Sequence, residues 1–115
     1  MIATASSIAA QLDMNARAAG DAVWLTSPDT GSTVTWGAAR DAAREIACQL
    51  DALGLAPGAS VAVAAQNSIW STLCFTGITT GGYLATPLNL VAGARVLSYV
   101  LGHSGASIVL CTDEQ

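Results

Sequence analysis

The sequence predicts an α/β fold, in which crossover helices join the strands of a three-layer-type parallel sheet and a β-hairpin lies near the N-terminus. The main observation is that helical and strand periodicities alternate from about residue 35 onward, an order typical of parallel strands. In addition, 52% of the 115 residues are hydrophobic and only 10% are charged. Such a chain can cover both faces of a small sheet, and it is too apolar to stay disordered.

Residues 1–20 predict a leading helix. Ser6 or Ser7 can cap it, because a side-chain oxygen there can accept a free backbone N–H of the first turn, and the helix should end near Gly20. Its apolar face is formed by Ile8, Ala9, Leu12 and Ala16.

Residues 21–35 predict the hairpin. Two β-rich runs, Val23 to Thr26 and Thr33 to Thr35, flank the turn-forming stretch 27–31, which reads SPDTG. Serine, proline, aspartate and glycine favour tight turns, so the two runs are expected to pair.

The strongest helical pattern begins after Thr35, a candidate N-cap, and continues to Leu53. Its end is predicted at Gly54, because glycine tolerates the left-handed conformation that closes many helices, and Leu55 can then contact Leu50. The apolar face of this helix is formed by Ala39, Ala43, Ile46, Ala47, Leu50 and Leu53.

The rest of the chain alternates strand and helix. The expected elements are a strand at 60–65, a helix from Asn67 or Ser68 to about Gly81, a strand at 83–86 closed by Pro87, a helix at about 93–102 and a strand at 107–111. The whole chain, 1–115, is therefore expected to form a single partial domain, with the alternating helices and strands occupying 36–112.

Charge and cysteine content exclude several classes of function. The four Lys and Arg residues are all arginine, against eight acidic residues and a net charge of −4, so a nucleic-acid surface is not expected. The three cysteines are too widely spaced for a zinc site and are expected to be buried small hydrophobes. Their odd number indicates a reducing compartment, and with no signal peptide the expected location is the cytoplasm.

An uncharged stretch from Ala52 to Ala94 raises the possibility of a membrane span. Its best window, Ile69 to Leu90, contains two adjacent glycines and Pro87, and it lacks a biased cluster of basic residues at one end. These features do not suit a spanning helix. We therefore expect no membrane span and read the stretch as a buried helix and strand.

No catalytic, cofactor-binding or metal-binding residue is predicted in this chain. His103 has no partner for general-base chemistry and is expected to be an exposed loop residue at a helix C-terminus, while Arg95 is expected to be solvated. No glycine-rich phosphate loop is present. Two glycines at 77 and 81 should let a helix lie close to the sheet. The tryptophans, predicted to pack in the core or between subdomains and to lie too far apart for a stacking platform, are Trp24, Trp36 and Trp70.

Four segments together resemble the adenylate-forming, or AMP-binding, synthetase superfamily. They occur in the family's order over roughly residues 20–112, and each alone would be a weak signal. The segments are 34–39 (VTWGAA), 53–63 (LGLAPGASVAV) with 66–68 (QNS), 80–89 (TGGYLATPLN), and 103–106 (HSGA) with 108–110 (IVL).

The chain departs from the family pattern at three positions. Ala38 replaces a glutamate common in the family, Thr80 replaces a lysine, and Val91 stands where an arginine is frequent. These changes affect structure and surface more than chemistry. Asn89, where amino-acid-adenylating members often carry aspartate, slightly favours the acyl-CoA or aryl-CoA ligases.

The resemblance implies a partial N-terminal subdomain of an ATP-dependent acyl-CoA or aryl-CoA synthetase, which forms an acyl-AMP from a carboxylate and transfers the acyl group to CoA. The family's phosphate loop, ribose-binding aspartate and catalytic lysine lie downstream of the matched segments, so ATP, Mg²⁺ and CoA are implied for the parent enzyme only. The expected partners are the rest of that enzyme and a small carboxylic acid. The alternatives are a free-standing, non-catalytic α/β interaction or dimerisation module, and a small membrane-associated protein.

Overall fold

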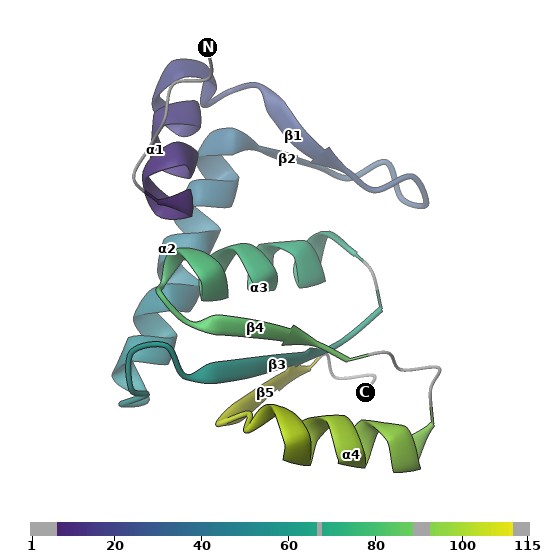
Figure 1. The fold of residues 1–115 in the computed structure, drawn as a ribbon. Helices are drawn as coiled ribbons and strands as arrows, with labels where there is room; N and C mark the ends of the chain where they lie inside the picture. Colours follow the sequence, from purple (N-terminus) through teal and green to yellow (C-terminus); the bar gives the residue numbers. More distant parts are fainter. Residues whose placement is uncertain (1–6, 67, 89–92, 112–115) are drawn as a thin grey trace.

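The computed structural model describes residues 7–66, 68–88 and 93–111, which form nine elements (Figure 1). The elements are α1 (Ile8–Ala19), β1 (Val23–Thr26), β2 (Thr33–Thr35), α2 (Trp36–Ala52), β3 (Ser60–Ala64), α3 (Ile69–Thr80), β4 (Leu84–Pro87), α4 (Ala94–Ser104) and β5 (Ile108–Cys111). The alternative caps Ser6 and Asn67, and the departures at Asn89 and Val91, lie outside the described residues.

The α/β prediction is confirmed. Strands β1 and β2 form an antiparallel hairpin, and the other three strands form a parallel sheet in the order β4-β3-β5. Val61 of the central strand is in register with Ala85 on one side and Ile108 on the other. Helix α3 lies on one face of this sheet, with α2 beyond it, and α4 lies on the opposite face (Figure 1).

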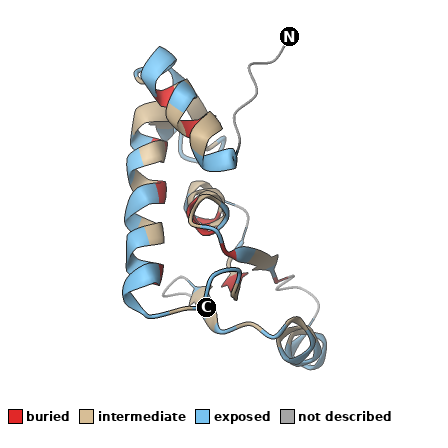
Figure 2. Ribbon diagram, turned by 60° about the vertical axis from the view of Figure 1, so that its left-hand side comes forward, coloured by how far each residue is buried: buried red, intermediate tan, exposed pale blue. Residues whose placement is uncertain are grey.

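The core lies between the sheet and the two helices α2 and α3. Because side chains alternate along a strand, Val61 and Val63 both point to this side, where they meet Leu50 of α2 and Ile78 of α3. These four are the largest fully buried side chains of the described residues. Figure 2 shows buried residues on α1, α2, α3 and the sheet, whereas α4 is coloured only as intermediate or exposed.

Three of the four helices begin with the side-chain caps that their sequences predict. In each, the side chain of the cap residue accepts a hydrogen bond from the backbone N–H three residues later; the caps are Ser7, Thr35 and Ser68. The Oγ of Ser71 also accepts from the backbone N–H of Ser68, which completes a capping box. Helix α4 instead begins at Gly93, which makes no side-chain cap bond. The end of α2 is also as predicted, since Gly54 has φ +77°.

Glycine 77 lies where α3 crosses α2. A Cβ atom at Gly77 would lie 2.6 Å from the Cβ of Ile46 and 3.2 Å from the backbone oxygen of Ala43. Gly81 has a similar relation to Ala47, 3.1 Å from its Cβ. The prediction that these glycines let a helix approach the sheet is therefore wrong, because the close approach is between two helices.

Two element ends differ from the sequence-based expectation. Pro87 belongs to β4 rather than closing it. The N–H groups of Leu84 and Leu88 donate toward β3, so the backbone nitrogen of Pro87 points to the free edge, where no hydrogen bond is lost. Helix α4 continues past Gly102 and ends at Gly105, which has φ +66°. The sequence predicts that the helix ends at about residue 102, but of the two glycines only Gly105 takes the left-handed conformation that closes a helix.

The apolar face predicted for α1 is shorter in the structure. Leu12 and Ala16 are buried against the neighbouring helices, whereas Ile8 is 61% exposed and Ala9 is also exposed. The buried face of α1 therefore begins at Leu12 and does not include its first turn. Among the described residues, no helix is both long enough and apolar enough to cross a bilayer.

Candidate functional site

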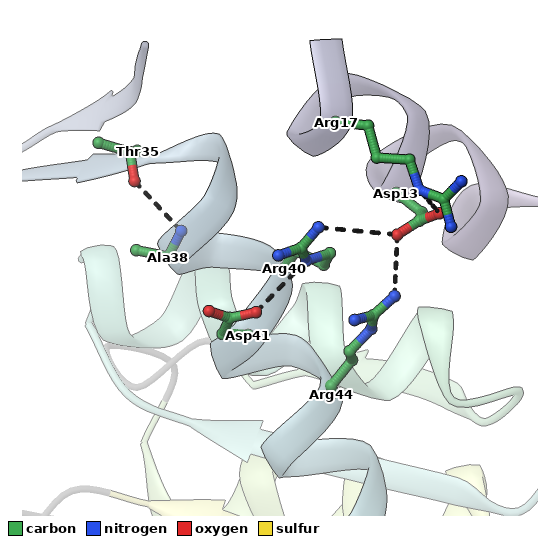
Figure 3. Close-up of polar contacts among 7 residues, drawn as sticks. All are labelled: Asp13, Arg17, Thr35, Ala38, Arg40, Asp41 and Arg44. Atoms are coloured by element: carbon green, nitrogen blue, oxygen red, sulfur yellow. Dashed lines mark hydrogen bonds and ion pairs between the residues drawn. The ribbon is translucent and has the colours of Figure 1, made fainter. Parts of the chain in front are cut away.

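The densest group of charges in the described structure surrounds Asp13 of α1. Its Oδ2 accepts from Arg17 Nε at 2.9 Å, and its Oδ1 accepts from Arg44 Nη2 at 2.8 Å and lies 3.8 Å from Arg40 Nη1 (Figure 3). Arg40 also donates from Nε to Asp41 at 3.3 Å. Three of the chain's four arginines therefore converge on a single carboxylate.

Helical spacing explains this convergence. Asp13 and Arg17 are four residues apart on α1, and Arg40 and Arg44 are four residues apart on α2, so each pair projects from one face of its helix. Where the two helices meet, these faces meet as well. The Asp13 side chain is only 25% exposed, whereas those of Arg17 and Arg44 are 77% and 61% exposed.

A small open pocket of about 140 Å³ lies beside the cluster, between α1 and α2. Its lining combines small apolar side chains with Asp13 and two of the arginines that pair with it. The lining residues are Ala9, Leu12, Asp13, Arg40, Ala43, Arg44, Ala47 and Thr80.

The contacts of this cluster are electrostatic. An arginine does not give up its proton at any ordinary pH, and both oxygens of the Asp13 side chain are engaged by guanidinium groups. Because Arg17 and Arg44 are largely exposed, each of their ion pairs with Asp13 stabilises the contact by no more than about 1 kcal/mol. The cluster therefore orients α1 on α2.

A second polar contact ties α2 to the sheet. The hydroxyl of Tyr83, just before β4, donates a hydrogen bond to Asp51 in the last turn of α2. That bond, with smaller effects from burial and from the carboxylate charge, raises the pKa of Tyr83. The ring of Tyr83 belongs to the core cluster, so the contact positions the start of β4.

His103 and Arg95, the two candidate residues weighed singly in the sequence, both lie on α4. His103 is exposed in the last turn of α4, where its ring stacks on Tyr99 with centroids 5.5 Å apart. The prediction of a helix C-terminus is confirmed, but the residue belongs to the helix and not to a loop. Arg95 is exposed near the start of the same helix, as expected.

The tryptophan prediction is wrong about spacing, because two of the three rings stack, and its core alternative does not hold for the third. Trp24 of β1 and Trp36 at the start of α2 stack with ring centroids 4.7 Å apart, although they are twelve residues apart in the chain. Hairpin pairing brings them together, because it places Val23 opposite Thr35. Trp70 is 39% exposed and is not a core residue.

The three cysteines differ in their exposure to solvent. Cys74 is buried in the core, and burial raises its pKa to about 11. Cys48 and Cys111 are exposed, which contradicts the expectation that all three are buried. Cys48 lies on the outer side of α2, and Cys111 alternates with core-facing Leu110 in β5.

Sequence reasoning missed the Asp13 cluster. The only available signal was the four-residue spacing within each helix, which places Asp13 with Arg17 and Arg40 with Arg44. Nothing in the sequence indicates that the two faces meet. In the part of the chain that the structure describes, no group of three His, Cys, Asp or Glu residues is arranged to hold a metal ion.

Comparisons with known proteins agree on one family. The model of the AMP-binding enzyme family matches residues 12–115. A sulfoacetate–CoA ligase of Cupriavidus necator is 30% identical over 102 residues, which is 89% of this chain and 20% of that protein. A long-chain-fatty-acid–CoA ligase of Mycobacterium tuberculosis, FadD13, is 32% identical over 83 residues, which is 72% of this chain and 16% of that protein.

Solved structures give the same result. The inhibitor-bound N-terminal domain of FACL13 from Mycobacterium tuberculosis superposes with a TM-score of 0.84 and 28% identity, over 91% of this chain and 26% of that domain. The anthranilate CoA ligase AuaEII, in complex with anthranoyl-AMP, shares the fold with a TM-score of 0.84 at 21% identity, over 94% of this chain and 20% of that one.

These matches identify the family of the chain. It spans about a fifth of the length of the curated relatives it matches, and its structural neighbours include N-terminal domains of acyl-CoA ligases. The parallel sheet, the helices and the ordered sequence segments all agree with that assignment. The chain belongs to the AMP-binding enzyme family, which is the adenylate-forming family that its sequence resembles.

Proposed function

We propose that this chain is the N-terminal scaffold segment of an ATP-dependent acyl-CoA or aryl-CoA synthetase. The parent enzyme would activate a carboxylate as an acyl-AMP and transfer the acyl group to CoA. The observation that carries the proposal is the 30% identity to a CoA ligase over 89% of the chain. The superposition with the N-terminal domain of FACL13 supports it independently.

In this proposal the segment itself performs no chemistry. The sequence has no lysine, so neither of the family's lysine roles can be filled here. The charged cluster at Asp13 orients two helices, and Tyr83 with Asp51 joins a helix to the sheet. ATP, Mg²⁺, CoA and the carboxylic acid would bind to residues of the parent enzyme beyond the segment, and the cytoplasm is the proposed location.

The first test asks whether the parent sequence continues. The reading frame is expected to run on past Gln115 into a glycine-rich loop that carries a lysine. The longer protein should then support pyrophosphate–ATP exchange and form an acyl-CoA. Sulfoacetate and a long-chain fatty acid are the first acids to assay, because relatives are ligases of these acids.

The second test uses the 115-residue chain alone. It should show no exchange above background with any of the same acids, because it has no phosphate loop and no acid–base pair. Exchange that is lost when a single residue of this chain is substituted would overturn the scaffold role. Failure of the longer protein to form an acyl-CoA from a broad panel of carboxylic acids would contradict the ligase assignment.

A further inference from the structure

The pocket between α1 and α2 combines two kinds of surface. Its apolar lining comes from both helices, with Leu12 buried on α1, and Ala43 buried and Ala47 half-buried on α2. Arg40 and Arg44 line the same pocket. Because an alanine side chain ends at Cβ, the two helices leave about 140 Å³ of open space between them. The pocket can therefore offer apolar contact and guanidinium N–H groups to one small molecule.

The charges beside this pocket are unbalanced in favour of the cations. Three arginines converge on Asp13, and one of them, Arg40, also pairs with Asp41, so three positive groups stand against two negative ones (Figure 3). The chain as a whole has a net charge of −4, so this positive spot lies on an acidic protein. An anion is the ligand that such a local charge attracts.

Asp13 does not use all the hydrogen-bonding capacity of the two arginines that line the pocket. Arg40 Nη1 lies 3.8 Å from Asp13 Oδ1, which is too far for a hydrogen bond. Arg44 donates to Asp13 from Nη2 at 2.8 Å, and a guanidinium carries five N–H donors in all. The Arg40 side chain is only 26% exposed, so an ion pair with it is less screened by water than one at an open surface.

We propose that this pocket binds a small amphiphilic anion, a carboxylate or sulfonate with an apolar tail of up to about six carbons. The head group pairs with Arg40 and Arg44. The tail lies on Leu12, Ala43 and Ala47. Its length follows from the volume of the pocket, because an apolar cavity of about 150 Å³ in another protein binds benzene. The site goes beyond the proposed function, since it lies between two scaffold helices and its occupation needs no ligase activity.

Alanine methyl groups provide a direct test in the full-length protein labelled with ¹³C at those groups. Hexane-1-sulfonate is the probe, because it has a charged head and a six-carbon tail but no carboxylate that a ligase could activate. It should shift the signals of the lining alanines in a saturable way and leave those of the sheet unchanged. The lining alanines are Ala9, Ala43 and Ala47, and the sheet alanines are Ala62 and Ala85.

Two related molecules separate the contributions of head and tail. Hexan-1-ol has the same tail without the charge, and methanesulfonate has the same head without the tail. Each should bind at least about tenfold more weakly than hexane-1-sulfonate, because charge-assisted hydrogen bonds and the burial of several methylene groups are both required.

A matched pair of arginine variants locates the head group. Arg17 and Arg44 both pair with Asp13, but only Arg44 lines the pocket. Arg44→Gln should therefore weaken the binding of hexane-1-sulfonate at least about fivefold, because a charged donor is lost. Arg17→Gln should weaken it by less than about twofold, since that side chain is 77% exposed and its charge is screened.

A matched pair of alanine variants locates the tail. Ala9 lines the pocket from an exposed position on α1, so Ala9→Phe should occupy the space and abolish the shifts of Ala43 and Ala47. Ala18 is also exposed on α1 but does not line the pocket, and Ala18→Phe should leave binding unchanged.

Several results would overturn the inference. Shifts that methanesulfonate reproduces at the same concentration would indicate a general anion effect, and shifts that hexan-1-ol reproduces would indicate apolar contact without the arginines. Equal losses in Arg17→Gln and Arg44→Gln would mean that both act through the orientation of α1. Lining signals that no probe moves, in a protein whose sheet signals show it to be folded, would mean that the pocket is filled or closed.

Discussion

The two faces of the parallel sheet are built in different ways. On one face, α2 and α3 cover a core that contains the fully buried Leu50, Val61 and Ile78. These helices have side-chain caps and cross at Gly77, where their backbones approach closely. This face holds together through interactions within the chain.

The opposite face is covered by α4, which has no buried residue and no side-chain cap. It leaves exposed Val96 and Tyr99, at 48% and 68%, and next to it β5 exposes Val109. The same chain thus completes one face of its sheet and leaves the other open. The difference indicates that the packing within this chain is concentrated on the α2 and α3 side of the sheet.

The largest expected difference between the two faces is in how far truncating one side chain lowers the free energy of unfolding. Ile78→Ala should lower the free energy of unfolding by about 2–5 kcal/mol, because it leaves a cavity in a closed core. Val96→Ala on α4 should change it by less than about 0.5 kcal/mol. Urea denaturation of both variants measures this, and similar losses would mean that α4 belongs to the same core.

The glycines of α3 and α4 should respond in opposite directions. Gly77→Ala should cost about 1–3 kcal/mol, since the added methyl group overlaps Ile46. Gly102→Ala on α4 should stabilise by about 0.5–1 kcal/mol, because that helical position has open space around it. Thermal unfolding of the two variants is the measurement, and an unaffected Gly77→Ala would show that α2 and α3 can move apart.

The helix ends offer a third comparison. Gly54→Val should destabilise the fold by about 1 kcal/mol or more, because φ is +77° there and a β-branched side chain disfavours that conformation. Gly105→Val, at the end of α4, should mainly fray that helix. Chemical denaturation followed by tryptophan fluorescence should therefore shift for Gly54→Val and hardly for Gly105→Val, and equal shifts would show that α4 unfolds together with the core.

The ion pairs of Asp13 should have a smaller effect. Asp13→Asn should destabilise by up to about 1 kcal/mol at low salt and by less at high salt, because Arg17 and Arg44 are largely exposed and salt screens their ion pairs with Asp13. Asp29→Asn, in the exposed hairpin loop, is the control and should be neutral. Denaturation at two salt concentrations compares them, and a salt-independent loss would mean that the carboxylate acts through shape and not charge.

A final effect appears only at high pH. Burial raises the pKa of Cys74 from 9.0 to about 11, so between those values the unfolded chain has released a thiol proton that the folded chain keeps. Stability should therefore fall as the pH rises through that range. Cys74→Ala should reduce the fall and Cys48→Ala should not, as measured by denaturation near pH 8 and near pH 11. The raised pKa of Tyr83 acts in the same direction.

Local chemistry explains why much of the fold could be predicted. The caps at Ser7 and Thr35, the stop at Gly54 and the turn between the hairpin strands depend on residues a few positions apart, so the sequence alone determines them. The order of segments that identifies the family is likewise a property of the sequence, and it needed no knowledge of contacts.

Only the tertiary structure determines which helix faces meet. The sequence shows Asp13 and Arg17 on one helix and Arg40 and Arg44 on another, but only the crossing of α1 and α2 joins them. In the same way, the sequence predicts that Gly77 lets its helix approach the sheet, whereas in the structure Gly77 lies against Ile46 of α2. Burial of Cys74 and exposure of Cys48 follow from where each helix face lies, which is set by long-range packing and not by local spacing.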